Sequence, residues 1–127
     1  MEFQYDPQHR RHVEGWNIIC SKGEDKIGLT ADEYNELVWD FMNNSMFSEA
    51  EECCNRGIRL GSTRSIALLG LLREKQGKPE EAYQLYLEAA LVGDRAGIRS
   101  LSELYKKGTY VERDPERAEM LRKIIEP

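Results

Sequence analysis

An internal repeat of 32 residues constrains this chain more than any other feature of its sequence. Leu37, Leu69 and Leu101 follow one another at that step, and Ala82 follows Ala50 at the same step. A pair of helices of this size cannot cover its own apolar face, so neighbouring copies must stack into a shared core. Small residues recur because packed helices must approach closely. The repeat therefore predicts an all-α fold of stacked helix pairs.

Apolar spacing, caps and helix breakers predict six helices after residue 29. Thr30 and Glu33 form the capping-box pattern that starts the first helix, and Ser48 is the expected N-cap of the second. Ala118 follows Ala82 by 36 residues, so the last unit has four extra residues in its turn. We expect a short right-handed α-solenoid of about three helix-turn-helix units, over residues 30–61, 62–93 and 94–127.

Residues 1–29 are expected to form a loose arm followed by a packing segment. Val13, Trp16, Ile19 and Cys20 lie on one face of a helix at their observed spacing, which favours a helix ending near residue 23. Gly15 weakens that helix. A strand over residues 16–20, with a return over 26–29, is the alternative that the sequence leaves open.

The formal net charge of −5 argues against general affinity for nucleic acids or anionic membranes, because both require a positive surface field. A basic protein partner is easier to accommodate. No apolar run approaches the roughly 20 residues that a membrane-spanning helix needs. The first residues carry neither a basic start nor an apolar stretch followed by a cleavage site, so a cytoplasmic location is expected.

The sequence offers few groups for chemistry, and we expect neither an enzyme nor a bound cofactor. His9 and His12 lie on one face of a possible helix and would hold a metal only if Cys20 or a carboxylate joined them. A solvated basic patch is the favoured interpretation. Cys53 and Cys54 are adjacent, which suits no ordinary disulfide, and their acidic neighbours do not activate a thiol. We expect one of these two to be in the core and the other half-exposed.

The C-terminal half of the chain resembles the Sel-one-like repeats, a branch of the tetratricopeptide repeats. The resemblance is specific over residues 63–126, weaker over 30–62 and absent before residue 30. Tyr110 departs from the pattern, since it stands where the family usually has a second glycine. The residues that carry the resemblance are the segment from Leu87 to Ala96 (LEAALVGDRA) and, in the longer turn, Tyr105, Gly108, Val111, Asp114 and Ala118.

The resemblance implies a scaffold that binds proteins or peptides on a concave surface lined by the first helix of each unit. Trp39 is the strongest anchor candidate, because large amphipathic rings are common binding hot spots. Packing of Trp39 against the segment around Trp16 is the alternative. Carrying the tetratricopeptide groove positions over by register gives Asn35, Trp39 and Met42 in the first unit, Ala67, Leu71 and Glu74 in the second, and Arg99, Glu103 and Lys106 in the third.

The leading functional hypothesis is therefore a non-catalytic protein-binding module, a small helical-repeat adaptor or scaffold. The main alternative is an immunity protein that binds a toxic enzyme and covers its active site. Only that alternative requires the partner to kill cells when this chain is removed. A chaperone that holds extended peptides and a metal-dependent enzyme are the two remaining hypotheses.

Overall fold

The computed structural model describes residues 28–126, which form six α-helices and no strands. The all-α prediction is thus confirmed for this part of the chain. The predictions made for residues 1–27 lie outside the described residues. None of the described helices is both long and apolar enough to cross a membrane. The helices are α2 (Ala31–Asn43), α3 (Phe47–Arg59), α4 (Thr63–Lys75), α5 (Pro79–Leu91), α6 (Arg95–Lys107) and α7 (Pro115–Ile125).

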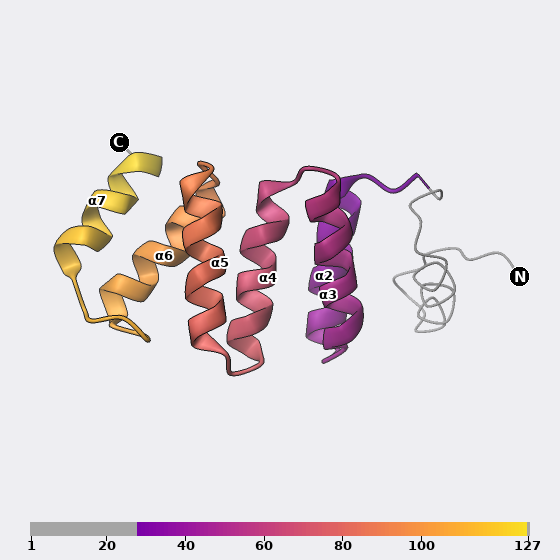
Figure 1. Ribbon diagram of the computed structural model, residues 1–127, viewed down its shortest axis with the longest axis horizontal. Helices are drawn as coiled ribbons and strands as arrows, with labels where there is room; N and C mark the ends of the chain where they lie inside the picture. Colours follow the sequence, from indigo (N-terminus) through magenta and orange to yellow (C-terminus); the bar gives the residue numbers. More distant parts are fainter. Residues whose placement is uncertain (1–27, 127) are drawn as a thin grey trace, which may run out of the picture.

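The helices are stacked in chain order, from the α2–α3 pair at one end to α7 at the other (Figure 1). Each helix packs against the next, and α4 also packs against both α2 and α6. No comparable contact joins α3 to α5 or α5 to α7 among these six helices. The first helices of the units, α2, α4 and α6, therefore form the inner layer of the stack, and α3, α5 and α7 form the outer layer.

The first five helices begin 16 residues apart, so the 32-residue repeat consists of two equal halves. Each of these helices has 13 residues and is followed by a short turn, apart from the longer one after α6. In the turn after α3, for example, the N–H of Ser62 donates to the Gly57 carbonyl at 3.0 Å and Gly61 has a φ of 91°. A left-handed residue closes the helix here because it lets the next N–H groups reach the last free carbonyls.

Side-chain caps fix several helix starts. Thr30 and Glu33 form the expected capping box, with N–H to side-chain oxygen distances of 2.8 and 3.2 Å. Asp94 caps α6 and also accepts a hydrogen bond from the Thr63 hydroxyl at 2.9 Å, which links the second and third units. The prediction that Ser48 caps α3 was wrong. That helix begins at Phe47, as the 16-residue step requires, and has no side-chain cap.

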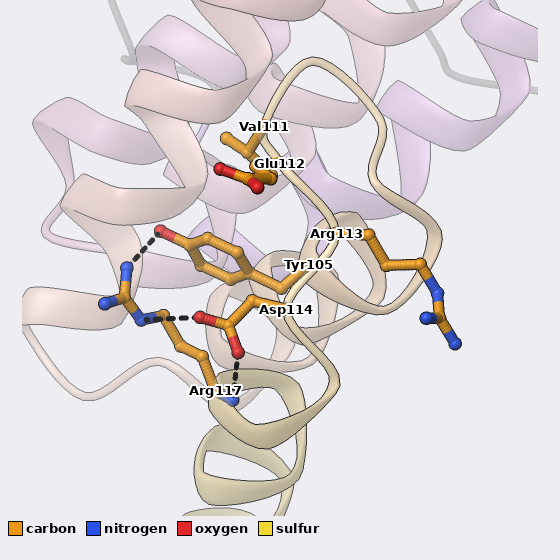
Figure 2. Close-up of a pocket in the computed structure, with 6 residues that line it drawn as sticks. All are labelled: Tyr105, Val111, Glu112, Arg113, Asp114 and Arg117. Carbon is orange, nitrogen blue, oxygen red and sulfur yellow. Dashed lines mark hydrogen bonds and ion pairs between the residues drawn. The ribbon is translucent and has the colours of Figure 1, made fainter.

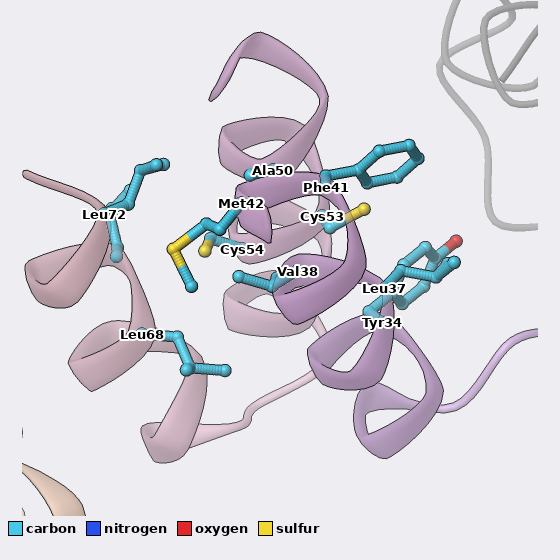
Figure 3. Packing of buried hydrophobic residues seen from close by; sticks show 11 residues of the cluster. Tyr34, Leu37, Val38, Phe41, Met42, Ala50, Cys53, Cys54, Leu68 and Leu72 are labelled. Carbon is cyan, nitrogen blue, oxygen red and sulfur yellow. The ribbon is translucent and has the colours of Figure 1, made fainter. Parts of the chain in front are cut away.

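Two apolar clusters form the core, one in α2, α3 and α4 and the other in α5, α6 and α7. In the first cluster, Val38, Met42 and Cys54 lie between the α2–α3 pair and Leu68 and Leu72 of α4 (Figure 3). The side chains on the α4 side of this pair therefore make the contact between the first and second units.

Candidate functional site

The inner layer of the stack contains an apolar hollow of about 200 Å³ to which all three of its helices contribute. We call it the inner hollow. Trp39 of α2 stands on one side and remains 42% exposed, although its neighbour Val38 is fully buried. One residue corresponds to a rotation of about 100° around a helix, which is enough to move a side chain from the core to the surface. The residues that line the inner hollow are Trp39, Arg64, Ala67, Leu68, Leu71, Ala96, Arg99 and Ser100.

The floor of the inner hollow is rigid because α4 supplies it from buried positions. Ala67 and Leu68 are both buried, and Leu71 is half-buried. A floor held by the core does not have to become ordered when a ligand binds, so less conformational entropy is lost on association. An exposed indole above such a floor is what an anchoring pocket for an apolar side chain requires.

The charged groups around the inner hollow are cationic. Arg64 and Arg99 are exposed, and neither forms an ion pair with any residue of the described range 28–126. Arg73, further along α4, is by contrast bound to Glu51 at 3.0 Å and to Glu81 at 3.3 Å. None of the residues that line the inner hollow is a carboxylate. The hollow therefore combines an apolar floor with two guanidinium groups that have no ion-pair partner within residues 28–126.

A second and more polar hollow, of about 410 Å³, adjoins the first on the α2 side. The two share Trp39 and Arg64, and Asp32, Asn35 and Glu36 complete the lining of the second. The inner layer thus carries two acidic groups, Asp32 and Glu36, in the hollow that adjoins α2. At the opposite, α6 side of the inner hollow it carries a cationic group, Arg99.

A buried tyrosine of α5 interacts with both α4 and α6, through Glu74 and Ser100. The ring of Tyr86 packs against Gly70 of α4, and the Tyr86 hydroxyl donates to the carboxylate of Glu74. Burial and then this hydrogen bond raise the pKa of Tyr86, whereas Ser100 on the lining acts in the opposite direction. The phenol of Tyr86 is therefore neutral at physiological pH and can donate its hydrogen bond. The Glu74 carboxylate thus has a hydrogen-bond partner inside the protein.

The structure brings together only part of the predicted site. Trp39, Leu71 and Arg99 line one hollow, as does Ala67. The expectation that Met42 lies on the accessible surface was wrong, because it is 4% exposed and belongs to the core.

The remaining predicted residues lie outside the inner hollow. Asn35 is 5% exposed, with its carbonyl accepting from Ser65 at 2.7 Å and its amide donating to Ser62 at 3.3 Å. Both ends of that amide are therefore used inside the protein, although Asn35 lines the adjoining polar hollow. Glu74 is held by Tyr86 as described, Glu103 pairs with Lys107 at 3.9 Å, and Lys106 is exposed but lines none of the hollows described here.

Sequence reasoning missed four residues of the lining. A rule was available, since they form two pairs that each keep the 32-residue step. Each of them lies three residues before a predicted groove position on the same helix, and positions three residues apart share a helix face. The missed residues are Arg64 and Ala96, and Leu68 and Ser100.

A third hollow, of about 550 Å³, lies between the longer turn and the start of α7. Three of its residues, Tyr105, Asp114 and Arg117, bind one another (Figure 2). Arg117 lies 5.2 Å from the centre of the Tyr105 ring, is 3.7 Å from Asp114 and donates to the Tyr105 hydroxyl at 3.5 Å. Hydrogen bonds from Tyr83 and then Arg117 lower the pKa of Tyr105. We interpret this cluster as the support that holds α7 in place.

Tyr110 keeps the left-handed conformation at the turn position where the resembled family usually has glycine. Its φ is 66°, and its ring lies against Tyr83 with the ring centres 5.7 Å apart. A side chain in this conformation is unfavourable unless contacts compensate for it. The tilted contact with the Tyr83 ring is such a contact, so Tyr110 keeps the left-handed backbone conformation at this point of the turn.

The two cysteines of α3 are both fully buried, so the expectation that one is half-exposed was wrong. Burial raises the pKa of Cys54 to about 12, which keeps it a thiol at physiological pH. His9, His12 and Cys20, the candidate metal ligands, lie outside the described residues. Within residues 28–126 no group of three or more histidine, cysteine, aspartate or glutamate residues is placed to hold a metal ion.

Comparisons of the chain with protein-family models, with curated proteins and with solved structures found no match. The resemblance to Sel-one-like repeats is therefore neither supported nor contradicted by them, and the function has to be argued from the inner hollow.

Proposed function

We propose that this chain is a non-catalytic protein-binding module, a small helical-repeat adaptor that holds a segment of a partner protein in the inner hollow. The observation that supports this proposal best is the exposed indole of Trp39 beside a rigid apolar floor. Helices from three successive units build that floor and its walls. A surface assembled from several repeats is the usual binding surface of a helical stack.

The free energy gained when a partner covers Trp39 is large enough to support recognition. A tryptophan side chain buries about 150–250 Å² when fully enclosed, so the area of Trp39 that is still exposed is on the order of 100 Å². At about 25 cal/mol per Å², covering that area contributes roughly 2 kcal/mol. This is the range of a binding hot spot.

We also infer that the stack is a right-handed solenoid of the Sel-one-like type. Three features support this: the 32-residue step, the close approach of small residues, and the four extra residues before α7. Gly97 illustrates the close approach, because a Cβ added there would lie 2.5 Å from the Cβ of Ala89 on the preceding helix.

The test is to isolate the partner from the native cell and to measure its affinity for purified variants by calorimetry. Trp39→Ala should weaken binding by about 1–2 kcal/mol, which is roughly five- to thirty-fold. Leu71→Arg, which places a charge in the inner hollow, should abolish binding. The matched control is Leu91→Ala, which truncates an exposed apolar side chain on the outer layer and should leave the affinity unchanged. If both inner variants remain folded and bind like the wild type, the proposal is wrong.

A further inference from the structure

We propose that the partner segment held in the inner hollow carries a bulky apolar side chain with an acidic side chain next to it, on the α6 side. This inference rests on the proposed function and specifies the chemistry of what is bound. It follows from the two cations that border the hollow, Arg64 and Arg99, and from the absence of any carboxylate in its lining.

The first step concerns the cations themselves. Arg64 and Arg99 have no ion-pair partner within the described part of the chain, so their guanidinium groups are available to a ligand. Guanidinium groups are weakly hydrated and present parallel N–H donors that match both oxygens of a carboxylate. An anion is therefore the complementary group for this border.

The second step concerns the apolar surroundings. Trp39 and Leu71 exclude water from one side of the hollow once a ligand side chain fills it. Removing water lowers the effective dielectric, which strengthens an ion pair at the border. A carboxylate next to the inserted apolar group thus gains more from Arg99 than it would gain from an arginine on an open surface.

The third step gives the inference a direction. On the α2 side of Trp39 the adjoining hollow presents Asp32 and Glu36 beside Arg64, and these carboxylates repel a second anion. On the α6 side Arg99 has no carboxylate near it in the lining. The acidic side chain of the ligand should therefore lie on the α6 side. Arg99 should contribute more than Arg64 to the preference for ligands that carry an acidic side chain.

The overall charge of the chain does not oppose this assignment. A net charge of −5 slows the approach of an acidic segment at long range, but salt screens that effect beyond about 8 Å at physiological ionic strength. The affinity is decided by the groups in contact. A partner that is basic as a whole can still present an acidic and apolar segment, so the expectation from net charge and the one from the hollow are compatible.

The experiment is a selection of binding peptides from a random displayed library on the immobilised full-length protein. Enriched peptides should contain an acidic residue adjacent to a tryptophan, phenylalanine, leucine or methionine. The best peptide should bind Trp39→Ala and Arg99→Gln about tenfold more weakly than the wild type. Arg95→Gln is the matched control, because Arg95 is an exposed arginine at the start of α6 that has no ion pair with another described residue and does not line the hollow.

A double-mutant cycle identifies the ion pair. Replacing the acidic residue of the best peptide by its amide should weaken binding to the wild type about tenfold and should have almost no further effect on Arg99→Gln. An equal loss with both proteins would overturn the inference.

The selection also separates this inference from the proposed function. The inference would be overturned, and the proposed function would stand, if the enriched peptides are apolar without an acidic neighbour and bind Trp39→Ala more weakly than the wild type. Peptides that bind Trp39→Ala as tightly as the wild type would count against both proposals. The enrichment of no peptide at all would do the same.

Discussion

At the scale of single residues, the spacing of left-handed backbone positions explains the regularity of the stack. A non-glycine residue in this conformation has a higher free energy than glycine, because its Cβ crowds the following carbonyl. The first of these positions is the only one of the five that lacks a glycine. The five are Ser45, Gly61, Gly77, Gly93 and Gly108, of which the first four lie 16 residues apart, with φ values of 57°, 91°, 75°, 84° and 74°.

Ser45→Gly should therefore stabilise the protein. We expect the free energy of unfolding to rise by about 0.5–1 kcal/mol, measured by urea denaturation with an unchanged m-value. Gly61→Ala is the matched reverse change. A Cβ at that position meets no atom within 4 Å, so its destabilisation, of about 1 kcal/mol, would come from the backbone conformation alone. A destabilising Ser45→Gly would contradict the explanation.

The same scale shows why the structure brings only part of the predicted groove residues together in one hollow. The register of the repeat placed Trp39, Asn35 and Met42 on one side of α2. Relative to Asn35, however, Trp39 lies about 40° further around the helix and Met42 about 20° in the other direction. The boundary between core and surface passes through this narrow arc. Sequence spacing cannot locate it, because it depends on the angle at which α2 meets α3 and α4.

At the scale of elements, the sequence predicted the helices and their capping well where a side chain carries the signal, as at Thr30. It failed at the start of α3, where no side chain caps the helix and the turn geometry sets the boundary. The repeated glycines at 16-residue spacing were the signal for that boundary. A pattern of turns can therefore locate a helix start that residue preferences do not indicate.

Packing between α4 and α5 depends on the absence of a side chain at Gly70. A Cβ at this position would lie 2.7 Å from Cε1 of Tyr86, which is too close for the ring to stay where it is. Gly70→Leu should lower the free energy of unfolding by at least about 2–3 kcal/mol through overpacking. Urea denaturation monitored by circular dichroism measures the change, and Leu91→Gly is a control of the same size on an exposed site. Wild-type stability in Gly70→Leu would show that α4 and α5 do not pack in this register.

At the scale of the whole molecule, the stack creates the inner hollow, which no single unit possesses. Trp39, Leu71 and Arg99 come from three units and meet because α4 contacts both α2 and α6. The prediction that these three residues share one surface came from the groove positions of the resembled family, carried over at the 32-residue step. The ion pairing of each arginine was not predictable, because it depends on which carboxylates the packing of the outer helices brings near, as Glu51 and Glu81 are brought to Arg73.

The buried Cys54 makes the stability of the whole stack sensitive to alkaline pH. Its pKa is about 12 in the folded protein, against a usual value near 9, so the folded state keeps a proton that the unfolded state loses. Its contribution to stability is therefore fully present below about pH 9 and is lost as the pH rises toward 12. Between pH 8 and pH 10 the free energy of unfolding should fall by about 1–2 kcal/mol from this group.

Urea denaturation at both pH values, compared between the wild type and Cys54→Ala, measures that contribution. Cys54→Ala is less stable at pH 8 because it leaves a small cavity, but it should lose about 1–2 kcal/mol less than the wild type between pH 8 and pH 10. Cys53→Ala is the control, since it changes the neighbouring buried thiol and keeps the alkaline loss caused by Cys54. Equal losses in the wild type and in Cys54→Ala would mean that this thiol is accessible to water, and hence that α3 and α4 do not close over it.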